Sequence, residues 1–313
     1  MFRYVIKRIL FLIPTILGVA FIIYFVLNLT PGNPGRSILG PQATQEAVDQ
    51  LNEELGYNDP LVVKYFRYVK NVVTKGDFGT SYFTKQPVMQ EVLPRFSVTL
   101  QLSLIGILIS TLIGVPLGML TAVKQYSAWD YIPSILAFLL AAVPSFVMGM
   151  VLLLVFSLKL NWLPSYGLAT WDCYIMPSLS MSIAITAFNI RFTKSAMLES
   201  IRADYIDTAR AKGATERTVI WKHALKNALL PVITNIGLNL GGMIMGAVVS
   251  ERLFSVPGIG ALIVDRINYK DEPTIIAGTI IIAITFTIIM LIVDIIYAFI
   301  DPRIKAKYTR IKG

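Results

Sequence analysis

The sequence predicts an all-α membrane protein with six transmembrane helices, on the basis of composition and of how the apolar residues are grouped. Of the 313 residues, 55% are hydrophobic and only 15% are charged, whereas soluble globular proteins average about 45–50% apolar and about 25% charged residues. The apolar residues gather in six long, nearly uncharged runs. Each run is long enough to cross the apolar core of a bilayer as a helix, so an integral membrane protein is the favoured class.

The first predicted helix is the uncharged run 9–29, which follows the basic residues Arg3, Lys7 and Arg8. At about 1.5 Å per residue, this run spans the roughly 30 Å apolar core. A charged start before an apolar run is also typical of a signal peptide, but this run is long and no small-residue cleavage site follows it. We therefore expect residues 1–29 to form a retained N-terminal transmembrane helix that begins in the cytoplasm.

Residues 30–97 are the one large polar segment between apolar runs, and they predict a small extracellular α-helical insertion between helices 1 and 2. Helix start and stop signals mark two segments, 44–55 and 60–76, and residues 77–87 have the composition of turns. The segment contains seven Lys or Arg and seven Asp or Glu. Because it has no basic excess, the positive-inside rule favours the outer side of the membrane.

The remaining five runs predict a core domain over residues 98–302, in which polar links alternate between the two sides of the membrane. The link 159–172 carries aromatic residues that suit a membrane interface, and 251–273 is expected to be a polar outer loop. The five runs are 98–123, 131–158, 173–190, 227–250 and 274–293.

The distribution of charge supports this topology. The net charge is +9, which in a membrane protein is first a topology signal, and nucleic acid is the weaker interpretation. Eight Lys or Arg against four Asp or Glu lie between Arg191 and Lys226, and the tail 303–313 has five basic residues and no acid. Both regions are therefore expected in the cytoplasm, the first as a loop over about 191–228. The C-terminus is expected on the cytoplasmic side, like the N-terminus.

The cytoplasmic loop contains one polar segment, 204–231, with the signals of two short helices. Asp204 is expected to cap the first helix, whose Ile206 and Ala209 share one face, and Gly213 to end it in a left-handed conformation. Thr215 is expected to cap the second helix. The small residues 209, 211, 213 and 214 would let another protein approach the backbone closely. A basic tether that only sets topology is the alternative, and the spacing leaves both open.

The sequence lacks the motifs that would let the chain act as an enzyme or bind a nucleotide. It has no phosphate-binding loop, no H-E-x-x-H and no G-x-S-x-G motif. With one cysteine, Cys173, and one histidine, His223, it offers no disulfide framework and no cysteine-built metal site. The apolar runs are almost free of ionisable residues, unlike those of most gradient-driven carriers. Energy for transport would have to arrive from a separate protein.

Two amides interrupt the fifth apolar run. Asn235 and Asn239 are four residues apart and therefore lie on one face of the predicted helix. They could line a polar pathway or hydrogen-bond to another helix, and both interpretations stay open at this point.

The polar segment resembles the cytoplasmic loop of the permease subunits of ATP-binding-cassette importers, in the dipeptide, oligopeptide and nickel branch. The family motif is E-A-A-x-x-x-G-x(9)-I-x-L-P, and Asp207 stands at its glutamate and Gly213 at its glycine. His223 replaces the isoleucine and Lys226 the proline, a departure typical of this branch. The resemblance extends to the segments 29–34, 55–61, 76–81, 87–88, 143–146 and 251–260.

This resemblance implies a type I importer (MetI-like) permease fold and a subunit that lines the translocation pathway but catalyses no reaction. The implied partners are a second, similar permease subunit, two ATPase subunits that bind ATP and Mg, and an extracellular or periplasmic binding protein, all at a prokaryotic cell membrane in contact with lipid. The implied ATPase-coupling residues are Asp204, Tyr205, Asp207, Thr208, Ala209, Arg210, Ala211, Lys212, Gly213 and Ala214.

The resemblance favours di- or oligopeptides as the substrate. Nickel chelates, haem or another small solute are the alternatives within the same role. A stand-alone channel or gradient-driven carrier is the alternative from a different class.

Overall fold

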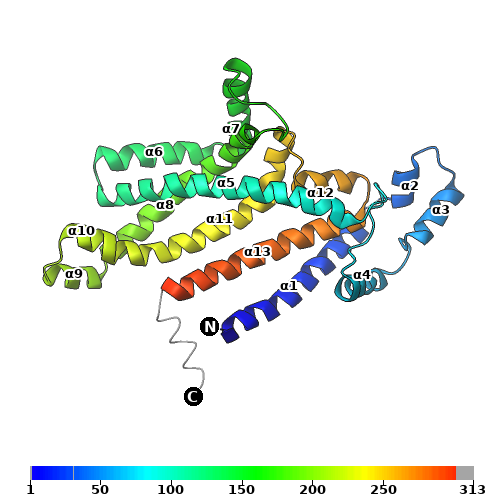
Figure 1. The fold of residues 1–313 in the computed structure, drawn as a ribbon, viewed down its shortest axis with the longest axis horizontal. Helices are drawn as coiled ribbons and strands as arrows, with labels where there is room; N and C mark the ends of the chain where they lie inside the picture. The colour runs from blue at the N-terminus through cyan, green and yellow to red at the C-terminus, as the bar shows by residue number, and fades with distance from the viewer. Residues whose placement is uncertain (1, 31, 301–313) are drawn as a thin grey trace. The chain divides into compact units, whose positions relative to one another are not determined.

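The computed structural model describes residues 2–30 and 32–300, and the side chains of residues 10–30 and 32–296. Within this part of the chain the structure is helical apart from connecting loops and one isolated bridge between Thr80 and Pro87 (Figure 1). It divides into two compact units, whose described residues are 100–256 with 288–300 (unit 1) and 2–99 with 257–287 (unit 2). The expected basic tail, 303–313, lies outside the described residues.

Five of the described helices are long and apolar enough to cross a membrane. A bent pair of helices, formed by residues 128–142 and 145–159, counts as a sixth span if it is taken as one. This result confirms the predicted all-α membrane fold. The five helices are α1 (Phe2–Leu29), α5 (Val88–Val123), α8 (Ile175–Ile201), α11 (Leu225–Leu253) and α13 (Glu272–Ile300).

The run expected at 131–158 is broken at Pro144. Helix α6 (Ala128–Ala142) and helix α7 (Ser145–Leu152), which continues as a π-helix to Lys159, meet at 99°. Val143 at the break has extended backbone angles, φ −88° and ψ 122°. A proline disfavours the helical conformation of the residue before it, which accounts for the position of the break.

In unit 1, α8 packs against α6, α7 and α11, and glycines bring it close to α5. A Cβ at Gly118 would lie 2.6 Å from the Cβ of Thr193 and 2.7 Å from the carbonyl oxygen of Ile190, so only glycine fits there. Helix α8 also continues eleven residues beyond the expected end of the run at 190. The charge of Lys194 is accommodated because its ammonium pairs with the buried carboxylate of Asp130 on α6.

In unit 2, the expected helices of the insertion are present as α3 (Gln45–Glu54) and α4 (Leu61–Lys75). Thr44 caps α3 through its side chain, and Gly76 ends α4 in a left-handed conformation with φ +64°. A shorter helix, α2 (Pro34–Leu39), was not predicted.

Residues 251–273 are not the continuous polar loop that was expected, because they contain helix α12 (Ile259–Asn268). Ile259 and Leu262 are buried against the N-terminal end of α5 and the first half of α13. Asp271, which follows α12, is fully buried and accepts hydrogen bonds from Ser81 Oγ at 2.6 Å and from the backbone N–H of Tyr82 at 2.9 Å. These contacts fix the turn region 77–87 within unit 2.

Candidate functional site

The candidate site is helix α9 (Asp204–Ala211), which lies with α10 (Glu216–Thr218) at one end of unit 1 (Figure 1). Only Arg202 and Ala203 separate α9 from the end of α8. A π-helix (Val219–Ala224) then joins α10 to α11. Any force on α9 is therefore transmitted directly to two membrane-spanning helices.

One face of α9 is anchored in a hydrophobic cluster. Ile206 is completely buried and Ala209 is 9% exposed, which confirms the expectation that they share an inward face. Ile206 belongs to one buried cluster with Val115 and Ala122 of α5, Met197 of α8 and Val219 of the π-helix. Burying an isoleucine side chain contributes about 1.5–3 kcal/mol, so this residue is the main attachment of α9.

The expected cap at Asp204 is wrong by one residue. Ala203 occupies the N-cap position with extended backbone angles, φ −81° and ψ 144°, and makes no side-chain cap bond. Asp204 and Asp207 instead lie in the first turn of α9, where both are exposed. Carboxylates at this position interact favourably with the positive end of the helix dipole.

A chain of two hydrogen bonds ties α9 to both neighbouring helices. The Oγ of Ser200, at the end of α8, lies 2.5 Å from the hydroxyl oxygen of Tyr205 and 2.8 Å from the carbonyl oxygen of Ala224. A serine hydroxyl has one hydrogen, and a carbonyl can only accept. Ser200 therefore donates to Ala224, and Tyr205 donates to Ser200.

A group of ion pairs holds α9 next to α10. Arg210 Nε donates to Glu216 Oε1 at 2.8 Å, and Arg210 Nη1 donates to Asp207 Oδ1 at 3.2 Å. The hydrogen bond to Glu216, and then that carboxylate's charge, raise the pKa of Arg210. Because these side chains are exposed, water and salt screen the pairs, and their main effect is on local geometry.

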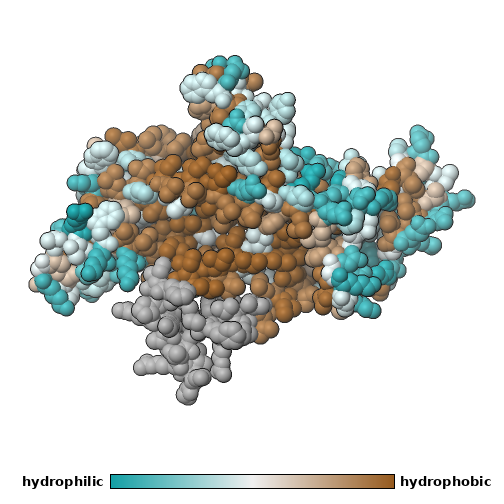
Figure 2. All heavy atoms as spheres, viewed as in Figure 1, coloured by the Kyte–Doolittle hydropathy of each residue, from teal (hydrophilic) through white to brown (hydrophobic). Residues whose placement is uncertain are grey.

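The outward surface of α9 is polar and open. Thr208, Ala211, Lys212 and Gly213 are exposed, and Figure 2 shows this end of unit 1 as hydrophilic beside apolar helices. Gly213 has φ +82°, as expected for a residue that ends a helix in the left-handed region, and a Cβ built there would meet no atom within 4 Å. The chain itself thus leaves free space above this glycine.

The second expected short helix is present but is not separate. Thr215 caps it by accepting a hydrogen bond from the N–H of Thr218 at 3.4 Å, as predicted. The helix then continues through the π-helix into α11, so that 216–253 is one helical element of 38 residues. The basic residues Lys222 and Lys226 do not interrupt it because both are exposed.

The two candidate pathway residues on α11 form an interhelical hydrogen-bond cluster. The side-chain amides of Asn235 and Asn239 donate to Asn189 Oδ1 of α8 at 3.0 and 3.2 Å. Asn189 is 1% exposed, and its own amide lies 3.5 Å from the Oγ of Ser110 on α5. Sequence reasoning missed Asn189, although an amide inside an apolar run is a signal of such bonding. A role in lining the pathway stays a prediction.

Comparison with known families identifies the chain. The model of the "Binding-protein-dependent transport system inner membrane component" matches residues 114–306, and the N-terminal model of the same membrane components matches residues 1–103. The chain belongs to this family. It is a multi-pass inner-membrane component of a bacterial ATP-binding-cassette importer, and its role is in transport and not in catalysis.

Relatives match this membrane component over nearly its whole length. The glutathione transport system permease protein GsiC of Salmonella paratyphi A is 39% identical over 307 residues, which cover 98% of this chain and 100% of the relative. The dipeptide transport system permease protein DppB of Alkalihalophilus pseudofirmus is 38% identical and covers 97% of this chain and 100% of the relative.

A solved structure supports the fold. The inward-facing methionine transporter MetNI matches with a TM-score of 0.58 over 69% of this chain and 98% of the matched chain, at 18% identity. This similarity confirms the predicted type I importer fold of the core. Membership of the family also implies an ATPase and a substrate-binding protein as partners. Among the described residues, no group of three or more His, Cys, Asp or Glu could hold a metal ion.

Proposed function

We propose that this membrane component forms part of the translocation pathway of an importer for di- or oligopeptides, which receives its substrate from an extracellular binding protein. The relatives that match it from end to end are named as dipeptide and glutathione permeases, and glutathione is itself a small peptide. A nickel chelate or haem as the substrate would differ from the substrates in the names of these relatives. The family assignment disfavours a stand-alone channel or gradient-driven carrier.

In this proposal, residues 204–214 couple the chain to the ATPase. The observation that carries it is the division of α9 into a face anchored by Ile206 and an open, small-residue surface that ends at Gly213. An anchored helix transmits force, and an open surface of small residues accepts a partner. ATP and Mg are bound by the ATPase subunits, and α9 moves with them as a rigid element of unit 1.

The proposed assembly contains this chain, a second, similar permease subunit and two ATPase subunits on the cytoplasmic face. Residues 30–97 lie outside, and both termini lie in the cytoplasm. The charge distribution along the sequence supports this orientation.

The coupling role is tested by Gly213→Asp in the complete complex, reconstituted in liposomes with its binding protein. We expect the variant to insert normally but to lose association with the ATPase and peptide-stimulated ATP hydrolysis. The matched control is Gly167→Asp, because Gly167 also has φ +82° and free space around it. The control carries the same backbone strain and should keep the ATPase bound. Full transport by Gly213→Asp would overturn the coupling role.

The substrate is tested separately, by uptake of a labelled dipeptide into the same liposomes. Competition by unlabelled peptides but not by nickel chelates or haem is the expected result. Uptake of a nickel chelate without any peptide uptake would replace the proposed substrate and leave the coupling role unaffected.

A further inference from the structure

Helix α4 exposes an apolar face that no part of unit 2 covers. Val62, Phe66, Val69 and Val73 recur at helical spacing, and three of them are 55%, 64% and 77% exposed at positions 62, 66 and 73. We call these four residues the apolar face of α4. A row of large exposed apolar side chains on an amphipathic helix indicates contact with a partner or a membrane.

The neighbouring face of α4 is attached to α1 by tyrosines. Tyr65 Oη donates to the backbone carbonyl oxygen of Leu17 at 3.2 Å. The rings of Tyr65 and Phe21 meet edge to face at 5.4 Å, and those of Tyr68 and Tyr24 at 5.6 Å. Helix α4 therefore lies against the apolar part of a helix that is long enough to span the membrane, residues 10–29.

The apolar face of α4 continues the outer surface of α1. The ring of Tyr65 contacts Phe66 at 5.4 Å as well as Phe21. Phe21 and Phe25 of α1 are 43% and 48% exposed, as expected for side chains that meet lipid. Since lipid covers the exposed side of a spanning helix, the same lipid reaches Phe66.

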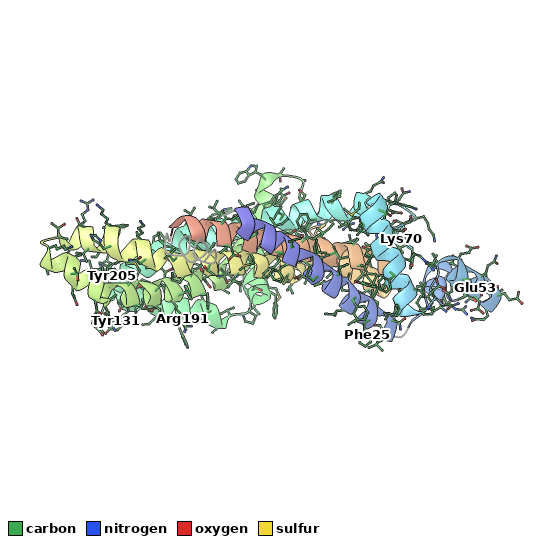
Figure 3. All side chains as sticks on the ribbon, turned by 90° about the horizontal axis from the view of Figure 1, so that it is seen from below. Phe25, Glu53, Lys70, Tyr131, Arg191 and Tyr205 are labelled. Atoms are coloured by element: carbon green, nitrogen blue, oxygen red, sulfur yellow. The ribbon has the colours of Figure 1, made fainter. Side chains whose placement is uncertain are left out.

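The direction of α4 also suits a membrane surface. In Figure 1, α1 is seen from the side and α4 nearly end-on; Figure 3, which labels Lys70 and Phe25, shows the two helices at an angle to each other. The contacts of α4 on α1 run from Tyr24 to Leu17, five to twelve residues before the end of α1 at Leu29, a depth of about 7–18 Å at about 1.5 Å per residue. The shallow end of this range matches the depth of about 5–10 Å to which interfacial helices bury their apolar side.

The basic residues of α4 indicate that its lipid partners have anionic headgroups. The helix contains four basic residues and no acid. Lys64 is buried near Glu272, and Arg67 pairs with Asp59 at 2.6 Å. Lys70 and Lys75 are exposed and have no ion-pair partner among the described residues. Lys70 lies beside the apolar face and Lys75 lies in the last turn of α4, and two available ammonium groups on this helix match anionic phospholipid headgroups above acyl chains.

We propose that α4 is an interfacial helix whose apolar face is immersed in the bilayer, with Lys70 and Lys75 binding anionic phospholipid headgroups. The partner is phospholipid and not a second protein. The lipid site lies on the membrane face where α1 ends at Leu29. It does not depend on which substrate is transported.

Spin labelling of the full chain tests the immersion. In a Cys173→Ser background, nitroxides are placed at Phe66→Cys and Val73→Cys in bilayer nanodiscs of phosphatidylcholine with some phosphatidylglycerol. Both labels should be reached by oxygen and protected from a water-soluble nickel complex. The matched control is Thr74→Cys, one residue further along and exposed, where the nickel complex should reach the label. The immersion would be overturned if the nickel complex reached the labels at 66 and 73 as readily as the label at 74. It would also be overturned if the labels at 66 and 73 were protected from both oxygen and the nickel complex.

The headgroup preference is tested with spin-labelled phosphatidylglycerol and phosphatidylcholine. Lys70→Gln and Lys75→Gln should each lower the preference for phosphatidylglycerol several-fold, whereas the exposed control Lys85→Gln should leave it unchanged. An unchanged preference in the first two variants, or an equal loss in all three, would overturn the assignment of these two lysines.

Discussion

Helices α9 and α4 are both short amphipathic helices beside membrane-spanning segments, but they expose opposite kinds of residue. Helix α9 buries Ile206 and exposes charged and small side chains, whereas α4 buries Lys64, partly buries its tyrosines and exposes valines and Phe66. The buried face attaches each helix, and the exposed face indicates its partner. The contrast suggests a protein partner for α9 and lipid for α4.

The two attachments also differ in strength and kind. Ile206 is fully buried in a hydrophobic cluster that also contains side chains of α5, α8, the π-helix and α11. Tyr65 is only partly buried and holds α4 through one hydrogen bond and edge-to-face ring contacts. Substitutions at three positions test this difference, and each can be followed by hydrogen exchange of the amides of the helix concerned.

The largest effect is expected for Ile206→Ala. Truncating a fully buried isoleucine costs about 2–5 kcal/mol, so the amides of α9 should exchange more than tenfold faster. Peptide-stimulated ATP hydrolysis of the reconstituted complex should fall as well. Thr208→Ala is the control on the exposed side of the same helix. Slow exchange retained in Ile206→Ala would show that α9 is held by other contacts.

An intermediate effect is expected at Tyr65. Tyr65→Phe removes one hydrogen bond, worth about 0.5–1.5 kcal/mol. Tyr65→Ala also removes ring contacts, each worth about 0.5–1.5 kcal/mol. Exchange of the α4 amides should therefore rise from wild type to Tyr65→Phe to Tyr65→Ala. If the two variants behave alike, the rings do not attach α4 to α1.

The smallest effect is expected for Glu216→Gln. It weakens the exposed contact with Arg210, which solvent screens. Exchange of the α9 amides and the melting temperature should not differ measurably from those of wild type. The same result is expected at low and at high salt concentration. Clearly faster exchange of the α9 amides in this variant would show that the ion pair helps to attach α9, contrary to the prediction from its exposure.

Local signals in the sequence predicted much of the fold and of the site. The helix start at Thr44, the helix end at Gly76, the cap at Thr215 and the left-handed Gly213 depend on adjacent residues only. The shared inward face of Ile206 and Ala209 follows from helical spacing. These features can be predicted from a single sequence because each requires a particular residue type within one or two turns.

Features that depend on distant residues were not predicted. The continuation of α8 past Arg191 and Lys194 depends on Asp130, which is far away in the sequence. Helix α12 was missed because it is only ten residues long and follows a segment rich in Pro and Gly. The burial of its apolar residues against α5 and α13 decides their conformation. The partner of Asn235 and Asn239 could not be identified because several polar residues in the other runs were equally suitable.

The π-helix at Val219–Ala224 determines how α10 and α9 are rotated about the helix axis relative to α11. A π turn accommodates one more residue than an α turn, and one residue corresponds to about 100° of rotation in an α-helix. Converting this π turn to an α turn without deleting a residue would leave α11 in place while turning the faces of α10, and with it the approach to α9, by about that angle. The orientation in which the chain presents α9 is thus encoded in the length of a single irregular turn.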